Sequence, residues 1–336
     1  MLSMRHFNIP VFIPGLACPY ACVFCDQQKI SGQHQIPSPQ EVHQITAQHL
    51  QTLPERNRRI EIAFFGGSFT GLPMKLQQQY LAAAHHWVAA GKVDGIRLST
   101  RPDFINPQVM ELLKRYNVSC VELGAQSLDD GVLERSGRGH TATDVARAAE
   151  MIVKAGIALG LQMMTGLPGD TFEKTMTTAK GIAALKATST RIYPTLVIGG
   201  TQLADLYQQG IYQPLTLEET ISRCAWLLDY FESAGITVLR LGLHPSGDIH
   251  QQDLVAGPWH PALKELVLTR LWEQELKKLL VRDTGSGISI AVAPSQLNAA
   301  IGHKAHNRKM LERHFGKVIF TTDPNLQGRR IHADPC

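Results

Sequence analysis

The chain has 336 residues and an ordinary globular composition, with 44% hydrophobic and 18% charged residues. The length suits one large barrel-like domain with an appendage, or two domains, and no apolar run reaches the roughly eighteen residues of a membrane-spanning helix. The formal charge of +4 is too small to identify a nucleic-acid partner by itself. Polar residues and prolines in MLSMRHFNIPVFIPG interrupt the apolar core that a signal peptide needs, which predicts a cytoplasmic location and no membrane partner.

The first predicted strand, residues 9–13, leads into a loop that holds three of the six cysteines. Cys18, Cys22 and Cys25 are spaced C-x3-C-x2-C, so a short loop can turn three thiolates toward one centre, as in iron–sulfur proteins. In a reducing cytoplasm, clustered thiols indicate metal or redox chemistry before disulfides. Two alternatives remain open: a zinc site completed by His34, and three buried cysteines without a ligand.

The chain up to residue 197 predicts strands that alternate with helices, which is typical of β/α units around a parallel sheet. We expect strands at 9–13, 60–65, 95–100, 118–124, 156–164 and 190–197, and helices at 39–53, 73–90, 106–116, 141–155 and 171–186. Thr141 and Thr171 have the features of helix N-caps. This α/β pattern predicts a partial (β/α)6 barrel of the TIM type, with its site at the carboxyl ends of the strands.

Through CPYACVFC, with an aromatic residue before the last cysteine, the chain resembles the radical S-adenosylmethionine (SAM) enzymes. The resemblance implies a 4Fe-4S cluster with three protein ligands, whose open iron binds the amino and carboxylate groups of SAM. It also implies that an electron from the cluster cleaves SAM to methionine and a 5′-deoxyadenosyl radical, which abstracts hydrogen from the substrate. A ferredoxin or flavodoxin is the electron donor that the family leads us to expect.

The same resemblance assigns cofactor contacts to two loops that follow strands. Gly66 and Gly67, in FFGGSFT, match the superfamily motif that contacts the SAM amino group, with Ser68 at the position usually held by Glu. Further candidates for SAM contacts belong to the fourth predicted strand and its end: Glu122, Gln126 and Ser127. A plain βα turn is the alternative for the two glycines.

Beyond the cysteine loop, the chain resembles the radical SAM domain of the Elongator catalytic subunit from about residue 9 to residue 250. The motifs that carry this resemblance are LSTRPD, VELGAQS, GRGHT, MTGLPGD, RIYPTLVIGGTQLADLYQQGIYQPLTLEE and VLRLGLHPSGD. That family starts the 5-carboxymethyl-type modification of wobble uridine in tRNA, so the resemblance implies tRNA or another RNA as the partner. Oxygen-independent coproporphyrinogen oxidases share some of these stretches but lack the YPTLVI block.

Two residues are candidates for the catalytic chemistry itself. Tyr193 lies where substrate would sit under the radical, and Arg138 precedes a helix in the GRGHT loop. The alternatives are core packing for Tyr193 and a surface cation for Arg138. His140 either faces a ligand or merely begins the helix, whereas Arg101 and Asp103 are expected to form an ion pair that shapes the rim.

The chain departs from the family pattern at several places. The family usually has lysine at the position of Arg191 and arginine at that of Gly199. The acetyltransferase domain of Elongator-type enzymes is not expected, because only roughly ninety residues follow the barrel. Acetyl-CoA-dependent chemistry would then need a separate acetyl-donor protein, or the scaffold carries out a different reaction.

The C-terminal region predicts a helix within 256–280, a turn-rich linker at 282–287, and then strand, helix, tight turn, helix and strand. We therefore expect three parts: a radical SAM partial barrel (1–255), a connecting helix and linker (256–287) and a small α/β segment (288–336). In that last segment, QLNAAIGHKAHNRKML resembles KH modules, whose I-G-x-x-G turn clamps a nucleic-acid backbone. The resemblance implies RNA contacts by Gly302, His303, Lys304, Arg308 and Lys309.

The KH-like turn departs from its pattern, because Ala305 replaces the second glycine and adds a methyl group at the closest backbone approach. The surroundings are nevertheless basic, which is the electrostatic footprint expected for phosphates. A stabilising appendage with a solvated basic face is the alternative.

The leading hypothesis is a radical SAM enzyme that acts on RNA and modifies tRNA. The second hypothesis keeps the radical chemistry but has a small metabolite or a peptide as the substrate, without RNA. The third is a non-catalytic iron–sulfur or zinc protein, against which the SAM-binding glycines argue.

Overall fold

A computed structural model of the chain describes residues 5–13, 22–26, 35–54, 56–243, 253–281 and 287–335. The chain divides into two compact units: unit 1 combines Met1–Leu215 with Phe231–Pro258, and unit 2 combines Thr216–Tyr230 with Trp259–Cys336. The three-part division expected from the sequence remains a prediction. Among the described residues, no helix has both the length and the apolarity that crossing a bilayer requires.

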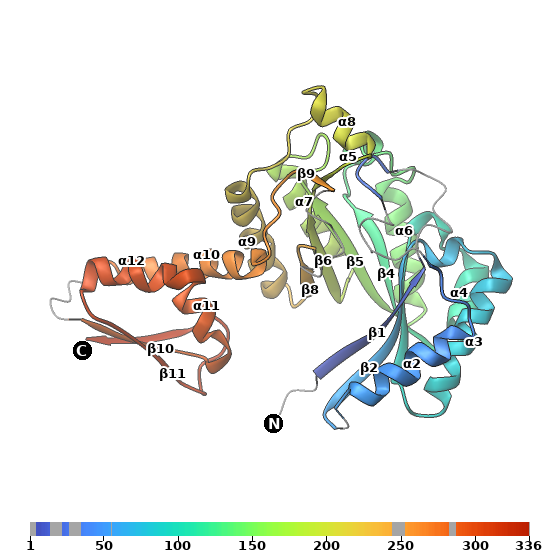
Figure 1. Cartoon of the computed structure of the whole chain (residues 1–336), viewed down its shortest axis with the longest axis horizontal. Coiled ribbons are helices and arrows are strands. Elements are labelled where there is room, and N and C mark those ends of the chain that lie inside the picture. The colour runs from blue at the N-terminus through green and yellow to red at the C-terminus, as the bar shows by residue number, and fades with distance from the viewer. Residues whose placement is uncertain are drawn as a thin grey trace. The chain divides into compact units, whose positions relative to one another are not determined.

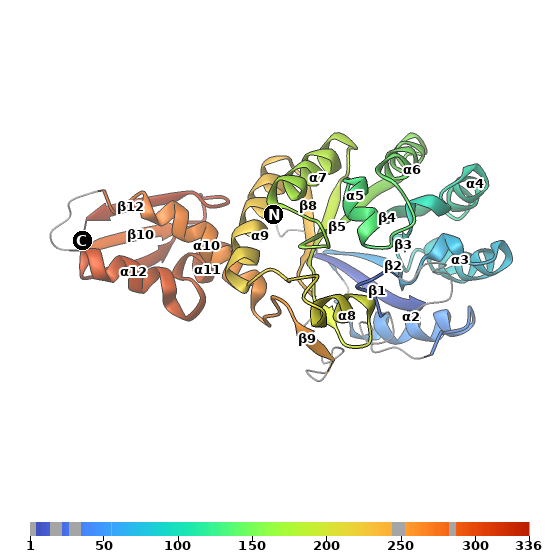
Figure 2. The same ribbon diagram turned by 90° about the horizontal axis from the view of Figure 1, so that it is seen from above.

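Unit 1 is built on a parallel sheet of seven strands, in the order β1-β2-β3-β4-β5-β6-β8 (Figure 1). The strands are β1 (Arg5–Ile13), β2 (Arg58–Gly66), β3 (Gly95–Thr100), β4 (Val118–Gln126), β5 (Ala158–Thr165), β6 (Ser189–Pro194) and β8 (Thr237–Leu241). A short antiparallel pair lies outside this sheet, β7 (Val197–Ile198) with β9 (Leu254–Ala256). The sheet curls with helices along its outer face, so unit 1 is a half-barrel (Figure 2).

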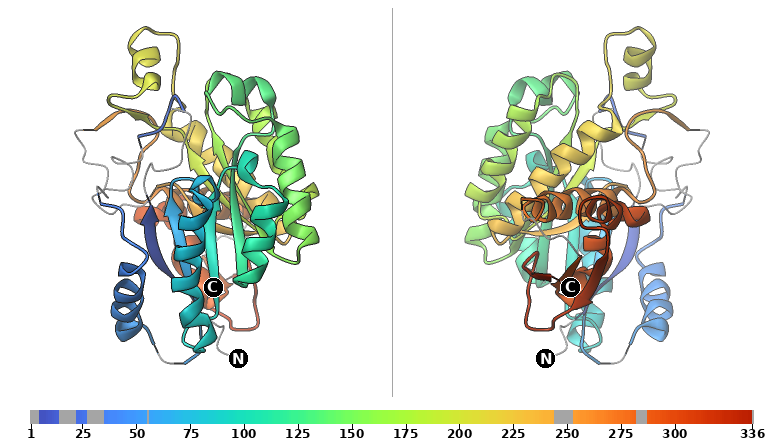
Figure 3. Two further views of the ribbon diagram at one scale, coloured as in Figure 1. Left: turned by 90° about the vertical axis from the view of Figure 1, so that its right-hand side faces the viewer. Right: turned by 90° about the vertical axis from the view of Figure 1, so that its left-hand side faces the viewer.

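Helices connect successive strands of the half-barrel, and the blue-to-teal ones lie side by side on its outer face (Figure 3, left). They are α2 (Glu41–Thr52), α3 (Met74–Ala89), α4 (Pro107–Arg115), α5 (Asp130–Arg135), α6 (Ala142–Lys154), α7 (Phe172–Ala184) and α8 (Gln202–Gln208), with the 3-10 turns η1 (Phe69–Gly71) and η2 (Pro102–Phe104). Both predicted N-caps are confirmed. Thr141 accepts from the Asp144 N–H at the start of α6, and Thr171 accepts from the Lys174 N–H at the start of α7.

The predicted partial barrel is confirmed, with one strand more than the sequence pattern indicates. The six predicted strands and five predicted helices are present in chain order, and only their ends differ. The additional strand, β8, is exposed or half-buried at every position except Leu241, so it lacks the apolar run of a buried strand. Its parallel pairing with β6 defines it instead.

Unit 2 contains a three-stranded sheet of order β11-β10-β12, in which β10 is parallel to β11 and antiparallel to β12. Its elements are α9 (Leu217–Ser233), α10 (Leu263–Lys277), β10 (Ile288–Val292), η3 (Pro294–Gln296), α11 (Leu297–Ile301), η4 (His303–Ala305), α12 (His306–Phe315), β11 (Val318–Thr322) and β12 (Ile331–Pro335). Helix α9 belongs to unit 2 as far as Tyr230. The predicted order of strand, helix, tight turn, helix and strand is therefore confirmed.

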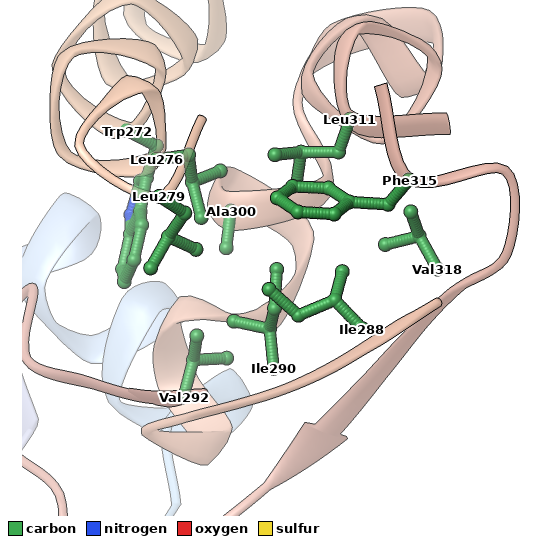
Figure 4. Close-up of a cluster of buried hydrophobic side chains, with 10 residues drawn as sticks. All are labelled: Trp272, Leu276, Leu279, Ile288, Ile290, Val292, Ala300, Leu311, Phe315 and Val318. Carbon is green, nitrogen blue, oxygen red and sulfur yellow. The ribbon is translucent and has the colours of Figure 1, made fainter. Parts of the chain in front are cut away.

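The core of unit 2 lies between its helices and one face of the sheet (Figure 4). Its buried members are Trp272, Leu276, Leu279, Ile288, Ile290, Val292, Ala300, Leu311, Phe315 and Val318. The Trp272 Nε1–H reaches the Gln296 Oε1 at 3.2 Å, which satisfies the one polar group of this indole. The segment before residue 288 is thus part of this core, since α10 contributes its largest side chain.

Candidate functional site at the carboxyl end of the half-barrel

The cysteine loop is described from residue 22 to residue 26, where it forms a tight turn held by its neighbours. The Cys25 N–H donates to the Cys22 carbonyl at 3.0 Å. The Val23 N–H donates to the Ser136 carbonyl at 3.1 Å, and the Leu203 N–H donates to the Val23 carbonyl at 2.7 Å. Backbone hydrogen bonds therefore fix this turn to the end of α5 and to the start of α8.

The side chains of this turn pack into an apolar cluster of unit 1. Its buried members are Cys22, Val23, Phe24, Val132, Leu167, Val197, Leu203, Ala204 and Tyr212, with Cys25 partly buried against them. Cys18 and His34 lie outside the described residues, so the predicted set of metal ligands stays a prediction. The apolar surroundings limit the access of water to both described thiols, which suits chemistry that must avoid side reactions.

Arg138 lies beside the first described cysteine. Its side chain is buried, and its guanidinium donates to the Cys22 Sγ at 3.2 Å and to the Gly124 carbonyl at 2.7 Å. Arg138 is therefore not a surface cation. A guanidinium at this place would offset the negative charge that Cys22 would carry as a metal ligand in an apolar site.

Three buried polar atoms at the end of β4, and in the loop between α5 and α6 that packs against it, lack a partner within the described structure. They are Nε of Arg138, Oε1 of Gln126 and Nδ1 of His140. Gln126 adopts a left-handed backbone conformation with φ of 66° at a register shift between β4 and β5. Buried donors and acceptors are normally satisfied, so these three atoms fit a polar molecule bound here. SAM, a small molecule with both donors and acceptors, would supply partners for such atoms.

The other predicted cofactor residues follow β2 and β4. Gly66 has φ of +108°, and a Cβ there would lie 3.1 Å from the backbone of Ile13. Only glycine therefore fits at this position, where the ends of β1 and β2 lie side by side. The Gly67 N–H donates to the Ile13 carbonyl at 2.9 Å. Ser68 is engaged by protein groups, since its hydroxyl lies 2.8 Å from the Thr100 hydroxyl and accepts from the Arg101 N–H. Ser127 accepts from the N–H of Asp129.

The sequence of this region matches a known family. The profile of the Radical SAM superfamily matches residues 12–181, and that of the Radical_SAM C-terminal domain matches residues 187–273. The chain belongs to the radical SAM superfamily. The predicted resemblance to this family is thereby confirmed, and the family implies a 4Fe-4S cluster and SAM as cofactors.

Among the relatives of this radical SAM chain, an uncharacterised protein of Methanocaldococcus jannaschii is 29% identical over 238 residues, which are 68% of this chain and 73% of that protein. The tRNA uridine(34) acetyltransferase of the same organism is 26% identical over 52% of this chain and 36% of its own length. Elongator complex protein 3 of Homo sapiens is 26% identical over 68% of this chain and 45% of its own length. The predicted likeness to the Elongator catalytic subunit is confirmed.

A solved structure shows the same fold. The archaeal Elp3 of Methanocaldococcus infernus has a TM-score of 0.60 and 20% identity, over 84% of this chain and 65% of that chain. The radical SAM chain thus spans between about a third and a half of the length of the tRNA acetyltransferase and human Elongator relatives it matches.

Inside the radical SAM half-barrel, Glu122 joins a network of ion pairs that crosses the sheet. Its Oε1 accepts from Arg97 at 3.0 Å and from Arg191 at 3.1 Å, and its Oε2 accepts from Arg191 at 2.5 Å and from Gln162 at 3.2 Å. Arg97 continues the network to Glu61 at 2.8 Å. Both Glu122 oxygens are thus occupied by neighbouring strands, which favours a structural role over the predicted contact to SAM.

Tyr193 stands beside this network, near the end of β6. Its side chain interacts with Arg191, whose guanidinium also lies 5.1 Å from the centroid of the Phe65 ring. Burial raises the pKa of Tyr193, so the phenol stays protonated and can donate a hydrogen bond. The predicted ion pair at the rim is confirmed, with Arg101 Nε 2.9 Å from Asp103 Oδ1.

Sequence reasoning missed Arg97, Gln162 and Arg240 as members of the inner face. A charged residue within an otherwise apolar strand, as in GIRLST and IEIAFF, is the signal that could have identified such positions. Cys120 and Cys224 are both buried, and burial raises the pKa of each thiol to about 12, which disfavours the thiolate form that binds metals.

In unit 2, the predicted RNA-binding residues divide between exposed and packed positions. Lys304 and Lys309 are exposed, whereas Gly302 is buried, and a Cβ on it would lie 3.0 Å from Thr269 Cγ2. The His303 N–H donates to the Thr269 hydroxyl at 2.8 Å. The remaining member, Arg308, lies over the Phe320 ring at 5.8 Å. Ala305 keeps the left-handed conformation that glycine favours, with φ of 58°.

The shifted pKa values of two buried side chains, His140 and Glu61, predict how the free energy of unfolding depends on pH. Burial, with the charges of Arg138 and Arg101, lowers the pKa of His140 from 6.5 to about 4. Although burial alone would raise the pKa of Glu61, its hydrogen bond with His6 and the charge of Arg97 lower that pKa from 4.5 to about 2. The unfolded state therefore binds an extra proton at the histidine between pH 6.5 and 4, and at the glutamate between pH 4.5 and 2.

Stability should accordingly fall in two steps as the pH falls, the first below about pH 6.5 and the second below about pH 4.5. His140→Asn is expected to remove most of the first step, which the pKa shift puts at up to about 3 kcal/mol, and to leave the second. Urea unfolding followed at pH 7, 5 and 4 measures this. An equal loss between pH 7 and 5 in the variant and the parent would contradict the buried neutral histidine.

Proposed function

We propose that this chain is a radical SAM enzyme that modifies tRNA, with the half-barrel as its catalytic domain. The observation that supports it most is the arrangement at the carboxyl end of the sheet. There, Arg138 contacts the Cys22 sulfur, and partnerless buried atoms of Arg138, Gln126 and His140 lie nearby. An apolar cluster and a polar ligand site beside a thiol suit the loading and shielding of a reactive cofactor better than they suit an electron-transfer or zinc module.

The residues present fit the two cofactors. Cys18, Cys22 and Cys25 would hold the 4Fe-4S cluster, and Gly66, Gly67, Gln126 and Ser127 would contact SAM. When bound, the cluster supplies an electron for the reductive cleavage of SAM and thus a radical for hydrogen abstraction. This chain's own contribution is to hold the thiolates, to keep water away, and to place Arg138 and Tyr193 at the strand ends beside the reacting groups.

Relatives named tRNA uridine(34) acetyltransferase and Elongator complex protein 3 support tRNA as the substrate. Our proposal includes a cytoplasmic location, a ferredoxin- or flavodoxin-type electron donor, and a separate acetyl-donor protein if the reaction uses acetyl-CoA. Comparing the modified nucleosides in tRNA from cells with and without this protein tests the proposal. Loss of one modified wobble uridine is expected, and an unchanged nucleoside profile would favour a small metabolite or a peptide as the substrate.

We assign RNA binding to the basic residues around the turn of unit 2. Lys304 and Lys309 are exposed, and their positive charges attract phosphates. Gly302 lets the turn pack closely against Thr269 of α10. His303 and Arg308 flank them as partly buried members of the same surface. The exposed lysines are thus the residues whose removal should weaken binding without disturbing the core.

Replacing Lys304 and Lys309 together with glutamine should weaken binding of bulk tRNA. The slope of log K against log salt concentration should decrease by about one for each phosphate contact that is lost. Lys154→Gln is the matched control, because that exposed lysine pairs with Glu150 on α6. Filter binding at several salt concentrations measures the slope. A double variant with the slope of the parent would exclude this surface as the RNA-binding site.

A further inference from the structure

The inner face of the half-barrel holds a second arginine next to Arg191. Arg240 on β8 is the register partner of Arg191 on β6, and register partners on adjacent parallel strands point to the same face. Tyr193 follows Arg191 by two residues on β6, so its side chain points to the same face of the sheet as those of both arginines. The Arg240 side chain is only partly buried, so it remains accessible.

The two arginines differ in their partners. Arg191 is bound by both oxygens of Glu122, and Arg97 is shared between Glu122 and Glu61. Arg240, in contrast, takes part in none of the hydrogen bonds or ion pairs among the residues that the structure describes. The two buried carboxylates of this face are therefore already neutralised by other arginines, and the charge of Arg240 is unmatched among the described residues.

An unmatched guanidinium beside a protonated phenol is suited to an anion. The planar fork of arginine matches the oxygens of a phosphate group and can bind two of them at once, while a phenolic O–H adds a third donor. Arg191 cannot take this role, because its guanidinium is engaged by Glu122, Phe65 and Tyr193.

We propose that Arg240 and Tyr193 form a subsite for a phosphate of the polynucleotide substrate, the phosphate that flanks the nucleotide undergoing reaction. This inference rests on the proposed function, and it adds a substrate contact on the inner face of the half-barrel itself. The subsite is distinct from the region proposed for SAM. Gln126 ends β4, and Arg138 donates to the Gly124 carbonyl of the same strand, which is separated from β8 in the sheet by β5 and β6.

Three variants test the subsite with bulk tRNA as the probe. Arg240→Gln is expected to weaken tRNA binding by about 10- to 100-fold, the effect of losing a charge-assisted hydrogen bond. Its salt slope should also decrease by about one. Arg240→Lys should restore part of the affinity, and Tyr193→Phe, which removes only the hydroxyl, should weaken binding less than Arg240→Gln does.

Arg59→Gln is the matched control. It removes the same charge from the start of β2, where Arg59 is 52% exposed and lies 3.3 Å from Glu61, and it should keep the affinity for tRNA. If the parent binds tRNA and Arg240→Gln binds it with the same affinity and the same salt slope, the proposed subsite is wrong, but the proposed function stands. An equal loss of affinity for SAM would also overturn the subsite, since Arg240 would then serve the cofactor. If the parent itself does not bind tRNA, the proposed function fails and the subsite fails with it.

Discussion

Replacing Cys22 or Cys25 with alanine is expected to remove the bound iron and to abolish turnover. If Cys18, Cys22 and Cys25 are the ligands, as proposed, the two that remain cannot hold a four-iron cluster at the place where SAM would bind. The effect should be complete within the sensitivity of the assay, which makes it the largest expected for any single substitution. Iron content, visible absorbance and 5′-deoxyadenosine formation, all measured anaerobically, provide the readouts.

Cys224→Ala is the control for this loss. Its thiol is fully buried in α9, and burial raises its pKa to about 12, so it should not serve as a ligand. The variant should retain its iron and its absorbance. Cluster absorbance that persists in Cys22→Ala or Cys25→Ala would refute the ligand assignment.

Replacing Glu122 with alanine should strongly destabilise the half-barrel. The substitution leaves Arg97 and Arg191 buried without the carboxylate that both contact, and breaking a buried pair in this way costs about 3–5 kcal/mol. Urea unfolding should show this as a large shift of the midpoint with little change of slope. Glu122→Gln retains the shape and hydrogen-bonding capacity, and should lose less.

Glu150→Ala provides the comparison for an exposed ion pair. Its partner, Lys154, is four residues away on α6, and both side chains are mostly exposed. Such pairs contribute about 0–1 kcal/mol, so the midpoint should hardly move. If Glu122→Ala were as mild as Glu150→Ala, the network would not stabilise the sheet.

The network accounts for an arginine at position 191, where the sequence resemblance leads us to expect lysine. Arg191 contacts both oxygens of Glu122 and also covers the Phe65 ring, and only a planar guanidinium makes these contacts together. A lysine at this position would provide a single point charge. The departure from the family pattern is therefore a packing feature of the inner face, and Arg191→Lys should weaken the network rather than preserve it.

Most of the fold could be predicted from local features of the sequence, namely the spacing of apolar residues and the residues that begin helices. Strand and helix order follows from apolar periodicity, and Thr141 and Thr171 mark helix starts by their own hydrogen bonds. The half-buried β8 shows the limit of this reasoning, because a strand that is stabilised by its neighbour has no distinct sequence signal. Element order is thus readable from the sequence wherever the burial is periodic.

The site was less predictable, because its contacts join residues far apart in the chain. Arg138 and Cys22 are 116 residues apart, and Glu122 and Arg191 are 69 apart. Ser68 and Glu122 match the positions of cofactor residues in sequence, yet their oxygens are occupied by protein partners that no motif reveals. Spacing thus locates the strand ends, while the hydrogen-bond partners decide which side chains remain open to a ligand.

The most direct test of the central claim is the reaction of the anaerobically reconstituted protein with SAM and a strong reductant. The account predicts iron and sulfide in the ratio of a four-iron cluster, and formation of 5′-deoxyadenosine and methionine in equal amounts. Bound zinc in place of iron, or an iron-loaded protein that forms no 5′-deoxyadenosine under these conditions, would contradict it.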